Sequence, residues 1–452
     1  MYKLLLKNGQ YPDFEEGRMK KANIAVENGK IAYIGQDEPQ AETVIDAEGL
    51  IVSPGFIDIH MHEENFAEEG EKYVIAQMML EMGVTTAVGG NCGMQNQDLA
   101  YFKEVIDRLG GSPVNYIMMA GYNTFRYQYG IGRYEAATQE QREAIHKLLK
   151  RELAEGAYGI SFGIEYDPGI TKDEILYAIS CTDDPQLIMS AHYRDDCTDN
   201  IEPVKEMIEI AEEIPMKFQI SHLSSCSALG QMQASLDAIN KAMEDNPRLD
   251  YDTYPYNAFS THMGSAVFED GCLESWHKDY SDILLTEEPY KDVRCTKEIF
   301  DKVRTEYPDM LGVAFVMNEE EIAAAIANKN GMVASDAIIN NGNGHPRAAG
   351  TFPRVLGKYV REDGVLPLID AVRKMTLEPA KRLNLDHKGR IKVGCDADLT
   401  VFNPDTVIDG ADFTNLHIQP EGIEYVYING ELALQNKVTV NDRLGRFISY
   451  QK

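Results

Sequence analysis

The sequence predicts an α/β protein: a (β/α)8, TIM-like barrel with a small β-sandwich domain formed from both ends of the chain. Strand-like apolar runs alternate with helix-period segments through the middle of the chain, and short strands with polar turns recur at its two ends. The length also favours two parts, because 452 residues exceed the roughly 250 at which a single core usually stops growing.

The β-sandwich domain is predicted from two segments that lie far apart in the chain. Near the N-terminus, YKLLLKNGQY is followed by KANIAVENGKIAYIGQ, in which Asn28-Gly29 is a hairpin signal. The same pattern of short strands and polar turns returns in GRIKVGCDADLTVFNP and EGIEYVYINGELALQNKVTV, with a second Asn-Gly at Asn429-Gly430. We therefore expect residues 1–55 and 385–452 to build one sheet domain, and residues 56–384 to build the barrel.

The barrel is predicted from eight strand-like runs that alternate with amphipathic segments such as REAIHKLLKRELAEG. In chain order the runs are FIDIHMH, VTTAVGGNCG, VNYIMMAGYN, YGISFGIEY, LIMSAHYR, FQISHLSS, LDYDTYPYN and MVASDAI. Catalytic groups in such a barrel come from the C-terminal ends of the strands. Residues 268–326, rich in charge and aromatics, are expected to form an insertion between the last two strands that could cover the barrel mouth.

The composition indicates which binding partners are disfavoured and which cellular compartment is expected. The formal net charge is −30, from 73 acidic and 43 basic residues, which disfavours nucleic acid and anionic membranes as partners. The sequence has no signal-peptide pattern and no run near the ~20 apolar residues of a membrane span, so a cytoplasmic protein is expected. Seven cysteines without framework spacing fit reduced thiols. The oligomeric state is left open, with a homo-oligomer among the options.

A pair of histidines closes the first predicted strand. Because side chains alternate along a strand, Phe56, Asp58, His60 and His62 share one face, and the two imidazoles are presented side by side. They could hold a metal or be two polar residues at a strand end. His-x-His is common by chance, so the other strands must decide between these readings.

The other strands supply candidate ligands at corresponding places. Cys92, Glu165, His192, His222 and Asp336 fall at the ends of the second, fourth, fifth, sixth and eighth strands. One buried histidine is often a hydrogen-bonded core residue, but four histidines, a cysteine and an aspartate at strand ends are not easily explained that way. Imidazole, thiolate and carboxylate together suit zinc, and a catalytic zinc site keeps one position open.

At these residues the chain resembles a known family. SPGFIDIHMH, GNCG, SAHYRDD, SHL, YPY, and ASD followed by GHPRAAGTFPRVLGKYVRE are similar to the N-acyl-D-amino-acid deacylases, or D-aminoacylases, of the amidohydrolase superfamily. The resemblance covers nearly the whole chain, including GRIKVGCDADLTVF near its end. The stretch from HPR to KYVRE is its most specific part.

The resemblance implies a barrel flanked by a β-sandwich and amide hydrolysis at a centre of one or two Zn²⁺ ions. Carried across by motif, Cys92, His192 and His222 would hold the tighter metal. His60 and His62 would form the weaker or second site, with Cys92 able to bridge.

The resemblance also implies roles for three further residues. Asp336 would be the general base, taking a proton from the metal-bound water that acts as nucleophile and passing it to the departing amine. Tyr254 of YPY would hydrogen-bond the developing oxyanion, and Arg347 of HPR would pair with the substrate α-carboxylate. As alternatives, Asp336 could cap a helix, Tyr254 and Tyr256 could both be packing aromatics, and Arg347 could be a surface arginine.

Two positions depart from the family pattern. Many relatives carry a substrate-binding lysine two residues after the sixth-strand histidine, where this chain has Ser224, so one cationic contact is missing. Glu165 stands where other superfamily branches place a carboxylated lysine, and it could bridge two metals or be a buried partner of Arg126 or Arg194. The absence of a lysine in that strand speaks against a dihydroorotase or hydantoinase that depends on one.

The hypothesis is therefore zinc-dependent hydrolysis of the amide bond of N-acyl-D-amino acids, with a small N-acyl amino acid or similar carboxylate as substrate. A related amidohydrolase acting on a dipeptide or a cyclic amide is the alternative among enzymes. From a different class, a non-catalytic binding or assembly barrel would be marked by lost ligands, and none of the expected ligands is missing.

Overall fold

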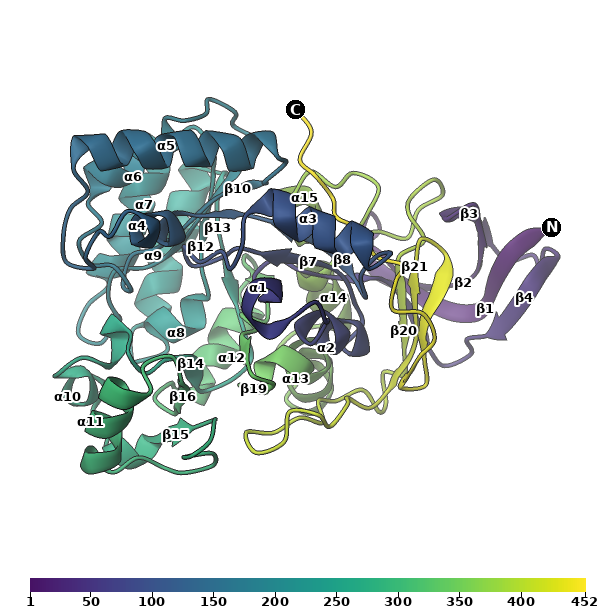
Figure 1. Ribbon diagram of the computed structural model, residues 1–452. Coiled ribbons are helices and arrows are strands. Elements are labelled where there is room, and N and C mark those ends of the chain that lie inside the picture. The colour runs from purple at the N-terminus through teal and green to yellow at the C-terminus, as the bar shows by residue number, and fades with distance from the viewer.

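Both ends of the chain build one nine-stranded sheet, which lies beside the barrel in the computed structural model (Figure 1). The structure describes residues 1–452. The two halves of the sheet join where β5 pairs antiparallel with β20, with Ser53 opposite Thr400. The N-terminal strands are β1 (Tyr2–Asp13), β2 (Arg18–Glu27), β3 (Lys30–Gly35), β4 (Ala41–Asp46) and β5 (Ile51–Pro54). The C-terminal strands are β20 (Leu399–Phe402), β21 (Ile423–Ile428), β22 (Glu431–Gln435) and β23 (Val438–Thr439).

The two Asn-Gly pairs are hairpin turns, as their sequence predicts. Asn28 and Gly29 join β2 to β3 with φ of 52° and 73°, and Asn429 and Gly430 join β21 to β22 with φ of 52° and 74°. Positive φ at both central residues is the conformation that favours Asn-Gly in two-residue hairpins. A separate apolar core of 14 buried residues, drawn from both halves of the sheet, stabilises this domain.

The barrel contains the eight expected parallel strands. They are β6 (Phe56–Asp58), β7 (Val84–Gly89), β8 (Asn115–Met118), β10 (Gly159–Gly163), β11 (Ile188–His192), β12 (Lys217–Ile220), β13 (Leu249–Thr253) and β17 (Met332–Val333). The short β9 (Ala120–Gly121) continues β8 and pairs with β10, and a parallel bridge from Met61 to Ala337 links the ends of β6 and β17. These two links close the barrel.

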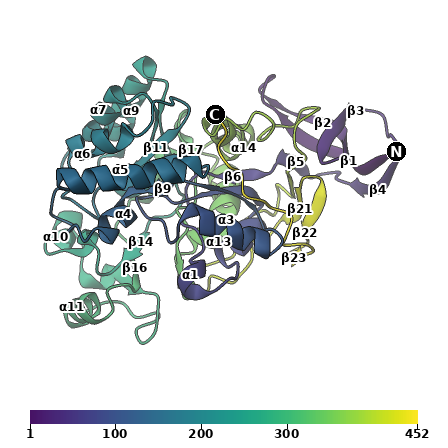
Figure 2. The same ribbon diagram turned by 45° about the horizontal axis from the view of Figure 1, so that its top comes forward.

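Helices surround the strands on the outside (Figures 1 and 2). The main ones are α2 (Ile75–Glu81), α3 (Leu99–Arg108), α5 (Gln139–Ala154), α6 (Lys172–Ile179), α7 (Glu202–Glu213), α9 (Met232–Asp245), α12 (Glu319–Ala327) and α14 (Leu368–Met375). Several begin at a side-chain cap: Asp98 caps α3, Asn318 caps α12, and Thr138 forms a capping box with Gln141 at α5. No helix in the structure combines the length and apolarity needed to cross a lipid bilayer.

The helix α15 (Leu377–Arg382) packs against the N-terminal ends of the strands. Its Arg382 donates to the main-chain oxygens of Phe218 and Arg248, where β12 and β13 begin. The cavities that adjoin the predicted ligands lie at the opposite end, where the strands finish.

An additional antiparallel sheet covers part of the barrel mouth. It consists of β14 (Phe259–His262), β15 (Ile283–Leu285) and β16 (Leu311–Ala314), with the helices α10 (Cys272–Trp276) and α11 (Lys297–Glu306). The expected insertion was 268–326. The extra sheet starts earlier, at Phe259, because β14 follows the YPY turn directly, and α12 packs on α9 as one of the helices around the barrel.

The last residues of the chain leave the sheet and lie on the barrel, although 385–452 was expected to belong to the sheet domain. Gly445 pairs with Ser112 and Phe447 pairs with Tyr116 of β8. The Tyr450 N–H donates to the Gly156 oxygen over 2.9 Å. The C-terminal segment thus connects the two parts of the molecule a second time.

Candidate metal centre and active site

The predicted ligands converge at the C-terminal ends of the barrel strands. β6 ends at Asp58, so His60 and His62 lie just beyond the strand rather than within it, with ring centroids 6.1 Å apart. The other candidates follow or finish their strands: Cys92 after β7, His192 at the end of β11, His222 after β12 and Asp336 after β17.

The donor atoms form two groups that share one sulfur. Cys92, His192 and His222 form one group, and His60, His62, Cys92 and Asp336 form the other. The Cys92 Sγ lies 3.3 Å from His60 Nε2 and 3.3 Å from His222 Nε2. His192 Nδ1 lies 3.0 Å from His222 Nε2. The first group contains the residues expected for the tighter metal, and the second contains Asp336 in addition to the residues expected for the other site.

These residues fit a bound metal ion by their chemistry. Ring nitrogens, a sulfur and a carboxylate oxygen point toward one another in a buried space, where a shared cation satisfies them all. Burial alone raises the pKa of the Cys92 thiol, but the neighbouring His60 and His222 outweigh burial and hold that pKa well below its usual range. A thiolate is the form of cysteine that binds metal.

Three residues of the site have an unusual backbone conformation. Cys92, His222 and Asp336 have φ of 51°, 33° and 50°, in the left-handed region that non-glycine residues rarely adopt. Such conformations persist where the surrounding structure enforces them, and they cluster at functional sites. In this chain each of them turns the side chain toward the shared centre directly after a strand.

The outward ring nitrogens of the histidines also have partners. His60 Nδ1 lies 3.2 Å from an Asp252 oxygen, and His222 Nδ1 lies 2.7 Å from the Ser225 Oγ. The Asp252 carboxylate also accepts the backbone N–H of His222 over 2.7 Å. Partners of this kind fix the orientation of metal-binding imidazoles.

Glu165 belongs to this outer set and not to either donor group, which departs from its expected place among the ligands. Its Oε2 lies 2.5 Å from His192 Nε2, the ring nitrogen that faces away from Cys92 and His222. The alternative partners do not contact it either, because Arg126 pairs with Glu174 and Arg194 pairs with Glu206. The reason is the orientation of the His192 ring, which presents Nδ1 to the centre and Nε2 to Glu165.

Asp336 lies between the donor groups and Arg347. Its Oδ1 is 3.4 Å from His62 Nε2, and its Oδ2 is 2.9 Å from Arg347 Nη1. Burial alone raises the pKa of this carboxyl, but Arg347 and then His222 lower it well below its usual range. Asp336 is therefore a carboxylate, able to accept a proton beside the metal-binding residues.

Arg347 is a buried arginine with unused donors. Its side chain is 2% exposed, and Nη2 donates to the Ser260 main-chain oxygen over 3.1 Å. Neither Nε nor Nη1 makes a hydrogen bond, since Nη1 approaches Asp336 without being aligned for one. The surface-arginine alternative is thus excluded, and two N–H groups remain available for an anion.

The structure separates the two tyrosines of YPY. Tyr254 lines a cavity beside the centre, and the Arg347 guanidinium lies 4.8 Å from the centre of its ring. Tyr256 faces elsewhere and donates to Asp409 over 3.2 Å. Ser224, expected at a substrate-binding position, is fully buried with its Oγ 3.4 Å from the Tyr254 nitrogen. It lines neither cavity at the centre, because the helix α8 (Leu223–Ser227) turns Ser225 inward instead.

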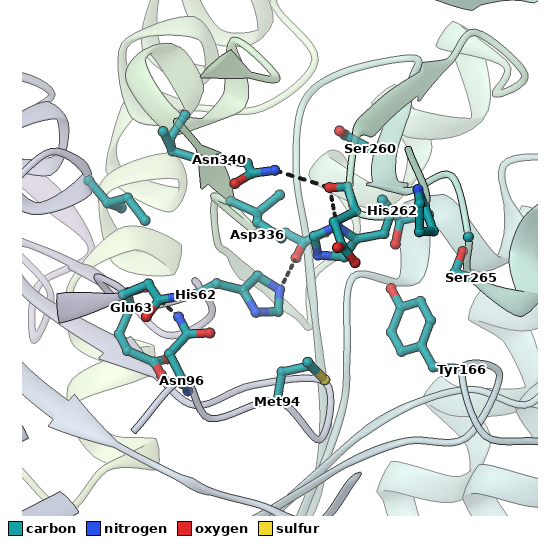
Figure 3. A pocket seen from close by; sticks show the side chains of 18 of the residues that line it. His62, Glu63, Met94, Asn96, Tyr166, Ser260, His262, Ser265, Asp336 and Asn340 are labelled. Atoms are coloured by element: carbon teal, nitrogen blue, oxygen red, sulfur yellow. Dashed lines mark hydrogen bonds and ion pairs between the residues drawn. The ribbon is translucent and has the colours of Figure 1, made fainter. Parts of the chain in front are cut away.

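Two connected cavities adjoin the centre. The outer cavity, of about 320 Å³, is lined by residues of the barrel and of β14, and Figure 3 shows His62 and Asp336 facing each other in it. The inner cavity, of about 20 Å³, contains Tyr254, His192 and His222 in its wall. The residues common to both walls are Tyr166, Ser260, Thr261, Asp336 and Arg347.

Sequence reasoning missed Asp252 and Ser225. Asp252 had a signal, because a carboxylate inside the apolar strand LDYDTY is unusual unless it has a buried partner. Ser225 had none, since a serine in a Ser-rich turn looks like any other turn residue. Both residues orient a histidine ring, a role that the alternation of polar and apolar residues along a strand does not reveal.

Comparisons with known proteins identify the family of this chain. The amidohydrolase family matches residues 51–433. D-aminoacylase from Alcaligenes xylosoxydans xylosoxydans is 30% identical over 477 residues, covering 99% of this chain and 98% of that protein.

Two solved structures are similar over their full lengths. One, described for the functional role of the binuclear metal centre in D-aminoacylase, has a TM-score of 0.88 and 28% identity, covering 99% of this chain and 100% of the other. The other is N-acyl-D-glutamate deacylase from Bordetella bronchiseptica in complex with zinc and a phosphonate inhibitor that mimics the tetrahedral intermediate. It has a TM-score of 0.87 and 25% identity, covering 99% of both chains.

The shared sulfur generates a prediction about metal content. Cys92 belongs to both donor groups, so Cys92→Ala should lose more metal on dialysis than His62→Ala, which removes a donor from one group only. Elemental analysis of the purified variants measures this directly. Retention of a full complement of metal by Cys92→Ala would contradict the sharing.

Proposed function

We propose that this chain, which belongs to the amidohydrolase family, hydrolyses the amide bond of N-acyl-D-amino acids to release the free D-amino acid. The chain is a metal-dependent hydrolase, and its relatives include D-aminoacylase and N-acyl-D-aspartate deacylase. The observation that carries the proposal is the buried Arg347, which offers two unused N–H groups to a carboxylate beside the metal-binding residues.

In this proposal Cys92, His192 and His222 would hold one Zn²⁺ ion, and His60 and His62 would hold a second. Zinc bound here would lower the pKa of water toward neutrality and polarise a carbonyl group. Glu165 orients His192 from outside, and Asp252 does the same for His60. All seven cysteines are unpaired, which supports a reducing, cytoplasmic setting.

Asp336 moves the proton. It accepts the proton that the attacking water loses as the new C–O bond forms, and it gives this proton to the amine nitrogen as the C–N bond breaks. Its position supports the role, because it faces His62 on one side and Arg347 on the other. The products are a carboxylate and a free amino acid.

Arg347 and Tyr254 position the substrate. The Nε and Nη1 groups of Arg347 make no hydrogen bond, and the planar guanidinium is suited to pairing with the α-carboxylate. The Tyr254 hydroxyl has only a distant contact with Met317 Sδ, at 4.0 Å, so it is free to donate to the oxygen on which negative charge develops.

The substrate class is tested by amine release from N-acetyl and N-formyl amino acids, D and L separately, with zinc-loaded protein. Dipeptides and cyclic amides belong in the same panel. We expect turnover of D-compounds and little of L-compounds. With the carboxylate at Arg347 and the acyl carbonyl at the metal-binding residues, the two enantiomers direct their side chains to different sides. Turnover confined to dipeptides or cyclic amides would keep the metal chemistry and refute the deacylase proposal.

Asp336→Asn should lower kcat by about 10²–10⁴-fold, the usual contribution of a general base or acid. Metal content should stay at the wild-type level because asparagine keeps a side-chain oxygen and the other ligands remain, and elemental analysis checks this. Asp405→Asn, at an exposed aspartate in the loop after β20, is the matched control and should behave as wild type. An Asp336→Asn enzyme with the wild-type rate would rule out this role.

Arg347→Lys should raise KM about 10–100-fold for an N-acetyl-D-amino acid, since hydrogen bonds to charged groups are worth about 1.5–3 kcal/mol. Lysine keeps the charge but cannot form the planar bidentate pair. The matching substrate is the same compound with its carboxylate replaced by a carboxamide, whose KM should change little. Equal losses on both substrates would show that Arg347 does not hold the carboxylate.

A further inference from the structure

The inner cavity contains two carboxylates that the proposed reaction does not use as proton carriers. Glu165 and Asp196 both line it, together with the apolar or aromatic side chains of Tyr193, Phe259 and Val267. Glu165 comes from the end of β10, and Asp196 comes from the loop between β11 and α7. The wall of the cavity thus combines aromatic and apolar side chains with acidic groups.

In each of the two carboxylates, only one oxygen contacts another side chain. Glu165 contacts His192 through Oε2, and Asp196 accepts from Trp276 Nε1 through Oδ2 over 2.7 Å. The other oxygen of each, Glu165 Oε1 and Asp196 Oδ1, accepts no hydrogen bond from the protein. Burial, and then the neighbouring Glu165 carboxylate, raise the pKa of Asp196 well above its usual range.

No lysine lines the inner cavity, and its one arginine is Arg347. That arginine pairs with Asp336 and, in the proposed function, with the substrate α-carboxylate. The position at which many relatives carry a lysine is Ser224, which lies outside the cavity. Glu165 contacts His192, and Asp196 has no cationic side chain as a hydrogen-bond partner.

We propose that Asp196, together with Glu165, makes the inner cavity select N-acyl-D-amino acids with a positively charged side chain and reject acidic ones. The inference rests on the proposed function, because Arg347 and Tyr254, which position the amino-acid half, both line this cavity. A cationic side chain supplies the missing positive charge between the two carboxylates. An acidic side chain adds a third negative charge, and such a clash is an effective means of specificity.

The size of the cavity limits how the side chain enters. At about 20 Å³, the cavity has room for about one water, so a substrate must displace part of its wall. Phe259 and Val267 belong to the insertion rather than to the barrel strands, and the Asp196–Trp276 hydrogen bond also reaches the insertion, at α10. In this proposal the substrate side chain enters by displacing residues of the insertion.

The test uses pairs of substrates of matched shape with zinc-loaded wild-type protein. N-acetyl-D-lysine is compared with N-acetyl-D-norleucine, which lacks the ammonium group, and N-acetyl-D-glutamine with N-acetyl-D-glutamate. We expect kcat/KM to be at least about tenfold higher for lysine than for norleucine, and for glutamine than for glutamate. A norleucine rate equal to the lysine rate, or a glutamate rate equal to the glutamine rate, would overturn the proposal.

Asp196→Asn tests the residue itself. The asparagine oxygen can still accept from Trp276, so the loop keeps its contact while the charge is lost. The lysine-to-norleucine ratio of kcat/KM should fall about tenfold, and an unchanged ratio would rule out Asp196. Trp276→Phe removes the hydrogen bond but keeps the carboxylate, and should retain the ratio. Asp195→Asn, at the exposed neighbouring residue, is the matched charge control and should also retain it.

The outcomes separate this inference from the proposed function. If norleucine is released and lysine is no faster, the deacylase proposal stands and the specificity proposal fails. If no N-acetyl-D-amino acid is hydrolysed, both the deacylase proposal and the specificity proposal fail. If Asp196→Asn does not fold, the lysine-to-norleucine and glutamine-to-glutamate ratios of kcat/KM for the wild-type protein still test the specificity proposal.

Discussion

The close approach of imidazole nitrogens to the Cys92 sulfur is the interaction on which the rest of the structure depends. His60 and His222 both reach the sulfur over 3.3 Å from different strands of the barrel. Burying so many polar atoms is costly unless a shared cation satisfies them. The left-handed backbone of Cys92 and His222 and the outer contacts of the rings all serve to hold this arrangement.

Buried carboxylates connect the strands that carry these groups. Asp252, on β13, holds the ring of His60 and the backbone of His222 at once, so one side chain sets the relative position of two ligands from other strands. Asp58 plays a similar part where the barrel closes, because it accepts the Ser335 N–H over 3.0 Å and also contacts the Ser335 hydroxyl. Ser335 directly precedes Asp336, so closure of the barrel also positions Asp336.

The fold and most of the centre could be predicted because they depend on patterns that the chain carries locally. Alternating apolar runs define the strands, Asn-Gly defines both hairpins, and residues at parallel strand ends meet at one rim. The role of Glu165 could not be predicted, because it depends on which nitrogen His192 turns inward. Ser224 depends on the rotation of a short helix, and the start of the insertion at Phe259 depends on pairing with a distant strand. These are properties of tertiary packing, which spacing in the sequence does not encode.

The pairing of β5 with β20 has a consequence for biosynthesis. The strands β1 to β5 precede the barrel in the chain, yet β5, which also pairs with β1, gains its second neighbour only when Leu399–Phe402 has been made. Until then β5 presents an open edge to other nascent chains, and open edges promote aggregation. The barrel is also incomplete at that stage, since Phe447 pairs with Tyr116 of β8. During synthesis both parts therefore stay unfinished until residues far along the chain have been made.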